Sequence, residues 1–137
     1  MDILHPVLGM IALSGLVIVV LLSSRLSRVI KNWGNLQHAE HSEVSRPQLP
    51  RPLRLITENY NHIFEQPTLF FATCAYIYMA GQTDALNVGL AWAYVGLRML
   101  HTITQVTSNN VTLRVSFFAT SSVSLVAMIT REVFKLV

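Results

Sequence analysis

Residues 54–67 read RLITENYNHIFEQP, and this stretch decides how the chain is interpreted. At about 100° per residue, five polar or ionisable side chains fall on or beside one narrow arc of a helix: Arg54, Glu58, Asn61, His62 and Glu65. An ionisable side chain inside a bilayer costs about 2.5–3.5 kcal/mol and usually lines a cavity or meets a partner. The arc therefore predicts opposite charges elsewhere in the chain, and Arg98 and Arg114 can supply them.

The composition indicates a membrane protein. The chain has 137 residues, of which 52% are hydrophobic and only 12% are charged, whereas soluble domains carry about 25% charged residues. This length fits one domain, and the net charge of +3 is too dispersed for a nucleic-acid partner. Cys74 is the sole cysteine, so neither an intrachain disulfide nor a zinc site is expected.

Four apolar segments predict an all-α integral membrane fold, a bundle of four transmembrane helices in a single domain over residues 1–137. A span needs about 20 helical residues, and we expect helices at 5–30, 55–81, 85–107 and 110–135. The first segment is followed by basic residues and has no basic region before it, which argues against a signal peptide. Pro67 should kink the second segment because its ring removes a backbone hydrogen bond.

The distribution of basic residues predicts the orientation. Six precede the second helix: Arg25, Arg28, Lys31, Arg46, Arg51 and Arg54. Only Arg131 and Lys135, near the C-terminus, are expected on the opposite side of the membrane. We therefore expect the polar connection at 31–53 in the cytoplasm and both termini outside; if the protein is bacterial, the membrane is the inner or plasma membrane. His38 and His41 in this connection are interpreted as solvated residues, so no metal site is predicted.

Polar side chains form a second stripe on the third helix. Arg98, His101, Thr102 and Gln105 recur at i, i+3, i+4 and i+7, as on one helix face. On the fourth helix, Arg114 shares a side with Asn110, Phe118 and Ser121. With this topology the intramembrane charges fall in the cytoplasmic half, and the outer half should be apolar.

This distribution predicts a polar pocket that opens toward the cytoplasm. The alternative is an ion pair between Glu65 and Arg98 or Arg114 that only holds the bundle together, but buried pairs are poor stabilisers. A channel or transporter is disfavoured because the polar residues stop halfway across. Basic groups facing acids and amides suit a zwitterionic or anionic ligand from the cytoplasm, with a lipophilic substrate arriving from the bilayer.

Two segments resemble the MAPEG proteins, the membrane-associated proteins of eicosanoid and glutathione metabolism. One is H-I-F-E-x-P at residues 62–67, and the other is YVGLRMLHTITQVTSNNVTLR at residues 94–114. The strongest part is the pattern R-x-x-H-T from Arg98, followed by Arg114 thirteen residues after the histidine. The likeness covers nearly the whole chain. The sequence resembles the prokaryotic members of the family better than the eicosanoid branch.

The resemblance implies a homotrimer with glutathione sites between neighbouring subunits. It implies that Arg114 is the catalytic arginine that stabilises the glutathione thiolate, since a nearby cation lowers the pKa of a thiol. It also implies that Glu65 contacts glutathione as a co-substrate. The predicted glutathione-contacting residues are Arg54, Glu58, Asn61, His62, Glu65, Arg98, His101 and Gln105.

The sequence departs from the eicosanoid branch of the family at three positions. Three residues before Glu65, the eicosanoid branch has an asparagine and this chain has His62. Glu58 replaces an arginine, and Phe118 replaces a tyrosine. Because Phe118 has no hydroxyl, help for a thiolate would come from Ser121, Gln105 or a water molecule.

Two functions are compatible with this sequence. The first is a membrane-bound glutathione-dependent transferase or peroxidase that acts on lipophilic electrophiles. The second is a non-catalytic lipid-binding or scaffold member of the same family. They differ in whether the arc at residues 54–65 holds glutathione without the arginine that the eicosanoid branch carries.

Overall fold

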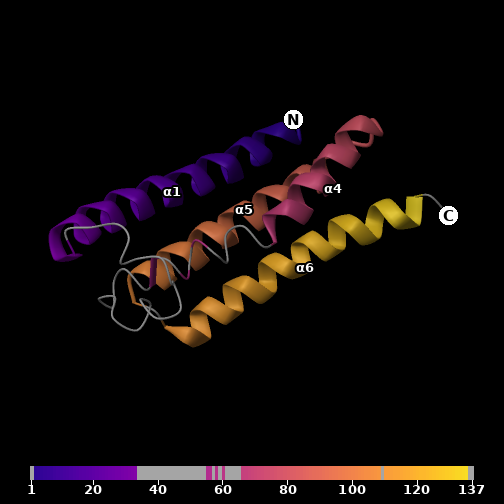
Figure 1. The fold of residues 1–137 in the computed structure, drawn as a ribbon. Helices are drawn as coiled ribbons and strands as arrows, with labels where there is room; N and C mark the ends of the chain where they lie inside the picture. The colour runs from indigo at the N-terminus through magenta and orange to yellow at the C-terminus, as the bar shows by residue number, and fades with distance from the viewer. Residues whose placement is uncertain are drawn as a thin grey trace.

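The computed structural model describes residues 2–33, 66–108 and 110–135, together with Leu55, Ile56, Glu58 and Tyr60. Its elements are the helices α1 (Leu4–Trp33), α4 (Pro67–Met79), α5 (Ala85–Val106) and α6 (Val111–Lys135) (Figure 1). The described residues include no strand, and the predicted all-α fold class is confirmed. Of the second expected helix, at 55–81, residues 57, 59 and 61–65 lie outside the described part.

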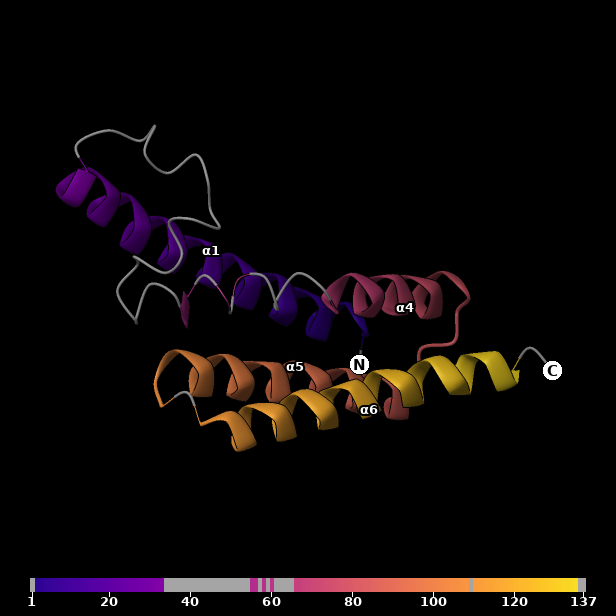
Figure 2. The same cartoon turned by 60° about the horizontal axis from the view of Figure 1, so that its bottom comes forward.

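Helices α5 and α6 form the most extensive helix pair of the bundle. These two helices run side by side. The N-terminal part of α1 lies along α5, and the C-terminal end of α1 diverges from it (Figure 2). Close packing at the N-terminal end depends on Gly9, since a Cβ atom there would lie 3.3 Å from the Trp92 ring and 3.5 Å from Val95. Helix α4 packs against both α1 and α6.

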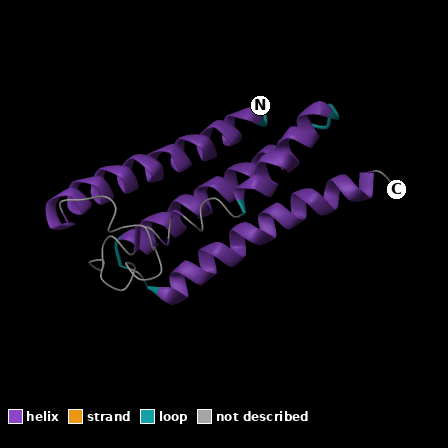
Figure 3. Ribbon diagram, in the orientation of Figure 1, coloured by secondary structure: helices purple, strands orange, loops and turns teal. Residues whose placement is uncertain are grey.

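Local signals set the ends of the helices, whose short connecting loops are teal in Figure 3. Pro67 lies in the first turn of α4, where its missing N–H would have no intrahelical partner. Gly81 follows α4 with a φ of 66°, the left-handed conformation that favours glycine after a helix. Asp84 caps α5 by accepting a 2.7 Å hydrogen bond from the Asn87 backbone N–H, and Asn110 caps α6 in the same way.

Apolar side chains between the helices form one core. Phe70 of α4 stacks on Tyr94 of α5 with 4.5 Å between ring centroids and 12° between ring planes, and Met10 and Met128 complete the cluster from α1 and α6. Stacked aromatic pairs add about 0.5–1.5 kcal/mol beyond their buried area. The stack therefore joins α4 to α5 about one helical turn before Arg98.

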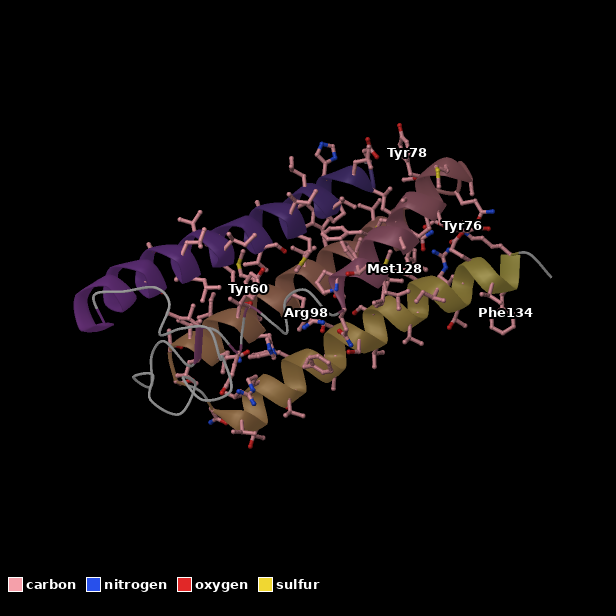
Figure 4. All side chains as sticks on the ribbon, viewed as in Figure 1. Tyr60, Tyr76, Tyr78, Arg98, Met128 and Phe134 are labelled. Carbon is pink, nitrogen blue, oxygen red and sulfur yellow. The ribbon has the colours of Figure 1, made fainter. Side chains whose placement is uncertain are left out.

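Two described segments, Leu4–Ser24 and Val111–Lys135, are long and apolar enough to cross a membrane. Only 28% and 17% of their respective apolar windows are buried within the chain, and Phe134 points away from the bundle (Figure 4). A core helix of a soluble protein would bury most of its apolar residues, so these outward faces suit lipid or a neighbouring subunit. Helix α4 is apolar but shorter.

The expectation that the other half of the bundle is apolar is wrong. There Arg131 donates to both carboxylate oxygens of Asp84, at 3.1 and 2.9 Å, and to Asn87 Oδ1 at 2.6 Å. Asn87 Nδ2 in turn donates to Glu132 Oε1 at 2.9 Å, and Lys135 Nζ does so at 2.7 Å. We call these five residues the polar clamp. The polar clamp joins the start of α5 to the end of α6. Asp84, which the sequence places in a turn, there meets Arg131 and Lys135, which it places near the C-terminus.

Asn87 is the central residue of the polar clamp because it is wholly buried and bonds both Arg131 and Glu132. The hydrogen bond from Arg131, with that from the Asn87 backbone, holds the pKa of the Asp84 carboxyl well below its usual range. The carboxylate is therefore ionised across the physiological range, and the clamp holds two acids against two bases.

Replacing Asn87 with alanine tests the clamp. The substitution removes one donor from the buried Glu132 and one acceptor from Arg131, so the free energy of unfolding should fall by about 1–3 kcal/mol. The measurement is unfolding in mild detergent followed by tryptophan fluorescence, with the exposed Thr130→Ala as control. If both variants stay within about 0.5 kcal/mol of wild type, the clamp does not hold the two helices together.

Candidate functional site

The polar stripe of α5 faces the interior of the bundle. Arg98, His101 and Gln105 are all buried, and they recur at three- and four-residue intervals on one helix face. Thr102 is half-buried and lines a groove on the α1 side instead. The structure therefore brings three of the predicted residues together in the interior.

Arg98 lies between α5 and α6 (Figure 4) and is only 1% exposed. Its Nε donates to the Tyr94 hydroxyl at 3.3 Å, and its Nη2 donates to Gln66 Oε1. The guanidinium carbon lies 5.4 Å from the Tyr94 ring centroid and 5.0 Å from that of Phe118, within reach of a cation–π interaction. These partners are all neutral, and among the described residues Nη1 has no hydrogen-bond partner.

His101 connects the stripe to the beginning of α6. Its Nδ1 lies 3.0 Å from the backbone oxygen of Arg114, so Nδ1 carries the proton and donates it to that carbonyl. The His101 and Phe118 rings are 6.0 Å apart and tilted by 52°. The Phe118 ring thus contacts both Arg98 and His101. One turn earlier on α6, His101 holds the backbone carbonyl of Arg114.

The side chain of Arg114 is half-buried in the first turn of α6. Its backbone N–H donates to Asn110 O at 3.0 Å, so the helix cap at Asn110 also orients this turn. An arginine here lies at the edge of the buried stripe. It can therefore face a ligand that enters from this end of the bundle.

Gln105 is the most enclosed amide in the site. It is 0% exposed, and neither its Oε1 nor its Nε2 has a hydrogen-bond partner among the residues that the structure describes. A buried amide without partners loses its hydration without compensation, at about 1–3 kcal/mol per group. Both a donor and an acceptor are thus available one turn beyond His101.

Three contacts of this site were not predicted from the sequence: Gln66, Tyr94 and Ser122. Gln66 Nε2 donates to Ser122 Oγ at 2.8 Å, and this hydrogen bond joins the start of α4 to α6 next to Arg98. Ser122 Oγ in turn lies 2.8 Å from the Phe118 backbone oxygen. Tyr94 stands four residues before Arg98, and this helical spacing was the one available signal for its contact.

Most of the arc of residues 54–65 lies outside the described part of the chain. Glu58 is helical and half-buried. The other predicted members, Arg54, Asn61, His62 and Glu65, lie outside the described residues, and so does any pairing of Glu65. Among the described residues, no group of three or more His, Cys, Asp or Glu side chains could hold a metal ion.

Apolar grooves lie between α1 and its neighbouring helices. One of about 330 Å³ lies between α1 and α5 and is lined by Leu13, Leu16, Val17, Val20, Ile56, Met99, Thr102, Ile103, Val106 and Thr107. A second of about 260 Å³ lies between α1 and α4 and reaches Pro67 and Phe71. Both grooves could take a lipophilic molecule, but neither is lined by Arg98, His101 or Gln105.

Comparison with known proteins identifies the family. The model of the MAPEG family matches residues 3–134, which is nearly the whole chain and includes the α5 stripe and the start of α6. Searches of curated proteins and of solved structures found no significant match. Because the match spans all four described helices, the resemblance seen in residues 94–114 is confirmed, and the chain belongs to the MAPEG family.

Proposed function

We propose that this protein is a membrane-bound glutathione-dependent transferase or peroxidase that acts on lipophilic electrophiles. The MAPEG family includes glutathione transferases and peroxidases as well as non-catalytic members. The observation that carries the proposal is the buried polar stripe of Arg98, His101 and Gln105, which meets the first turns of α6 beside Arg114. Such a stripe in an apolar bundle serves a polar ligand better than it serves stability.

In this proposal Arg114 stabilises the thiolate of glutathione. A guanidinium close to the sulfur favours the ionised thiol, and its effect is larger in a partly dry site than in water. In a transfer reaction, the thiolate sulfur forms a bond to the electrophilic carbon. The bond to the leaving group breaks, and the leaving group departs with its electron pair.

Gln105 is the best placed hydrogen-bond donor for this ligand. Phe118 has no hydroxyl, and Ser121 Oγ already lies 2.8 Å from the Phe118 backbone oxygen. The Gln105 amide has both of its polar atoms available within the described part of the chain. His101 then acts on Arg114 by holding its backbone carbonyl. Losing one donor to a developing charge costs about 2.7–4 kcal/mol, so we expect slow turnover.

The proposal includes a homotrimer that spans the membrane several times. The outward apolar faces of α1 and α6 leave ample surface for contact with neighbouring subunits or lipid. The excess of basic residues from the C-terminal end of α1 to residue 54 supports a cytoplasmic loop at 31–53 with both termini outside. In this orientation the first turn of α6 lies on the cytoplasmic side, where glutathione would enter.

Replacing Arg114 tests the proposed chemistry. Wild type mixed with millimolar glutathione should show the ultraviolet absorbance of a bound thiolate, and Arg114→Ala should lose it. Transfer to a generic lipophilic electrophile should fall by a factor of about 10²–10³ in the same variant. Arg114→Lys should keep part of both signals, because lysine retains the charge but loses the planar fork.

Thr112→Ala is the matched control because Thr112 is exposed in the same turn of α6. It should leave absorbance and rate unchanged. If wild type and Arg114→Ala equally lack a thiolate signal, the enzyme is rejected in favour of a non-catalytic binding member.

Cysteine labelling tests the orientation. Single cysteines at Ser42 and at Thr83, each with Cys74 replaced by serine, would be treated with an impermeant thiol reagent in intact cells and in inverted vesicles. Ser42→Cys should react only in inverted vesicles and Thr83→Cys only in intact cells. The reverse pattern would place the loop at 31–53 outside.

A further inference from the structure

Glu132 of the polar clamp is a buried acid with one oxygen that has no donor. The residue is only 4% exposed, and its Oε1 accepts from Asn87 Nδ2 at 2.9 Å and from Lys135 Nζ at 2.7 Å. Its Oε2 is enclosed and has no hydrogen-bond partner among the described residues, which include all of 66–108 and 110–135. Buried carboxylate oxygens are normally hydrogen-bonded, so this oxygen points to a donor from outside these helices.

A second buried acceptor belongs to a neighbouring residue, Gln82. Its Oε1 is also enclosed and has no hydrogen-bond partner within the described part of the chain. Asn87 Nδ2, which donates to Glu132 Oε1, also donates to the Gln82 backbone oxygen at 3.3 Å. Gln82 and Glu132 therefore lie on the same buried amide. Because both unsatisfied atoms are acceptors, the missing group is a hydrogen-bond donor.

Lys135 shows what kind of donor fits this position. Its ammonium nitrogen lies 2.7 Å from Glu132 Oε1 and 3.6 Å from Asp84 Oδ2. Lys135 is exposed and is the last residue of α6, whereas Asn87, the other donor to Glu132, is wholly buried. Lys135 is therefore the donor that can be exchanged. A primary ammonium that is not tethered to α6 carries three N–H donors and can serve both oxygens of Glu132.

The position of the polar clamp indicates a lipid as the source of this ammonium. Lys135 ends α6, a helix long and apolar enough to cross a membrane, so the polar clamp lies where the bilayer meets water. Tyr76, Tyr78 and Phe134 are exposed at the same end of the bundle (Figure 4). Tyrosines gather at membrane interfaces because their rings are apolar and their hydroxyls are polar. These side chains suit the acyl chains of a lipid whose headgroup reaches the polar clamp.

The charges of the polar clamp determine which headgroup fits. Two acids face two bases, so a zwitterionic headgroup leaves the site neutral, whereas an anionic headgroup or a metal ion would leave a net charge. An ammonium at Glu132 releases the Lys135 ammonium, which can then pair with the phosphate of the same headgroup. The trimethylammonium group of phosphatidylcholine has no N–H and cannot serve a carboxylate oxygen.

We propose that the polar clamp binds the headgroup of phosphatidylethanolamine. The primary ammonium of the lipid replaces that of Lys135 at Glu132, with Gln82 as a further acceptor, and Lys135 holds the phosphate. Asn87 lies 14 residues before His101 on α5, about 21 Å along the axis. The headgroup site is therefore separate from the α5 stripe, and the proposal does not depend on glutathione.

Competition between two lipids tests the headgroup site. The protein in mild detergent would be mixed with equal amounts of dioctanoyl phosphatidylethanolamine and dioctanoyl phosphatidylcholine, and native mass spectrometry would resolve which lipid is bound. The two lipids differ only in the methyl groups on the headgroup nitrogen. Wild type should prefer the ethanolamine lipid by at least about tenfold, because the choline lipid cannot form the hydrogen bonds of a charged donor.

Variants of the two acceptors test the assignment. Glu132→Gln keeps an oxygen for Asn87 but loses the charge, and should lower the preference to less than about threefold. Gln82→Met keeps the backbone contacts of this residue and should lower the preference by about threefold, since a neutral acceptor is lost. Asp2→Asn is the matched control, because it removes a carboxylate outside the polar clamp and asparagine can still accept from the Leu4 N–H. It should keep the wild-type preference.

The headgroup site is rejected if wild type binds neither lipid or both equally, since water would then serve the two acceptors. It is also rejected if Glu132→Gln keeps the wild-type preference. If water-soluble O-phosphoethanolamine displaces the lipid at equal concentration, the ligand is a soluble amine and the lipid assignment is wrong. Should Glu132→Gln fail to fold, Gln82→Met decides the question, and an unchanged preference in this variant would overturn the proposal.

Discussion

The burial of one arginine in an apolar helix bundle is the constraint on which the rest of the site depends. Arg98 is held by two aromatic rings, those of Tyr94 and Phe118, and by two neutral acceptors, Tyr94 and Gln66. The Phe70–Tyr94 stack connects this arrangement to the core. Because Gln66 at the start of α4, Tyr94 of α5 and Phe118 of α6 all contact Arg98, these three helices together hold its orientation.

The bundle contains two polar regions with different physical characters. In the polar clamp, two acids face two bases, and Asn87 connects them by hydrogen bonds. In the α5 stripe, by contrast, Arg98 Nη1 and the Gln105 amide have no hydrogen-bond partner among the described residues. The polar clamp can therefore serve stability within one chain, in addition to the lipid headgroup proposed for it. These groups of the α5 stripe have no partner within the described part of the chain, which is why we propose that the stripe binds a ligand.

The sequence predicts the all-α fold because long apolar segments indicate helices, and the spacing of Arg98, His101 and Gln105 determines their common face. It does not predict the neutral partners of Arg98, since Gln66 and Ser122 carry no charge and meet only when α4 packs beside α6. The polar clamp is missed for a related reason. Asp84 and Arg131 are 47 residues apart and, from sequence, belong to a turn and a tail. The arc at 54–65 lies mostly outside the described residues and stays a prediction.

The most direct test of this account is the free energy of unfolding of Arg98→Met in detergent without thiols. If Arg98 is retained to bind a ligand, its replacement strands only neutral groups, and stability should stay within about 1 kcal/mol of wild type or rise, as when buried charges are exchanged for apolar residues. A loss of about 3–5 kcal/mol would mean that Arg98 neutralises a buried carboxylate. In that case the charge holds the bundle together, and the account of a ligand site is contradicted.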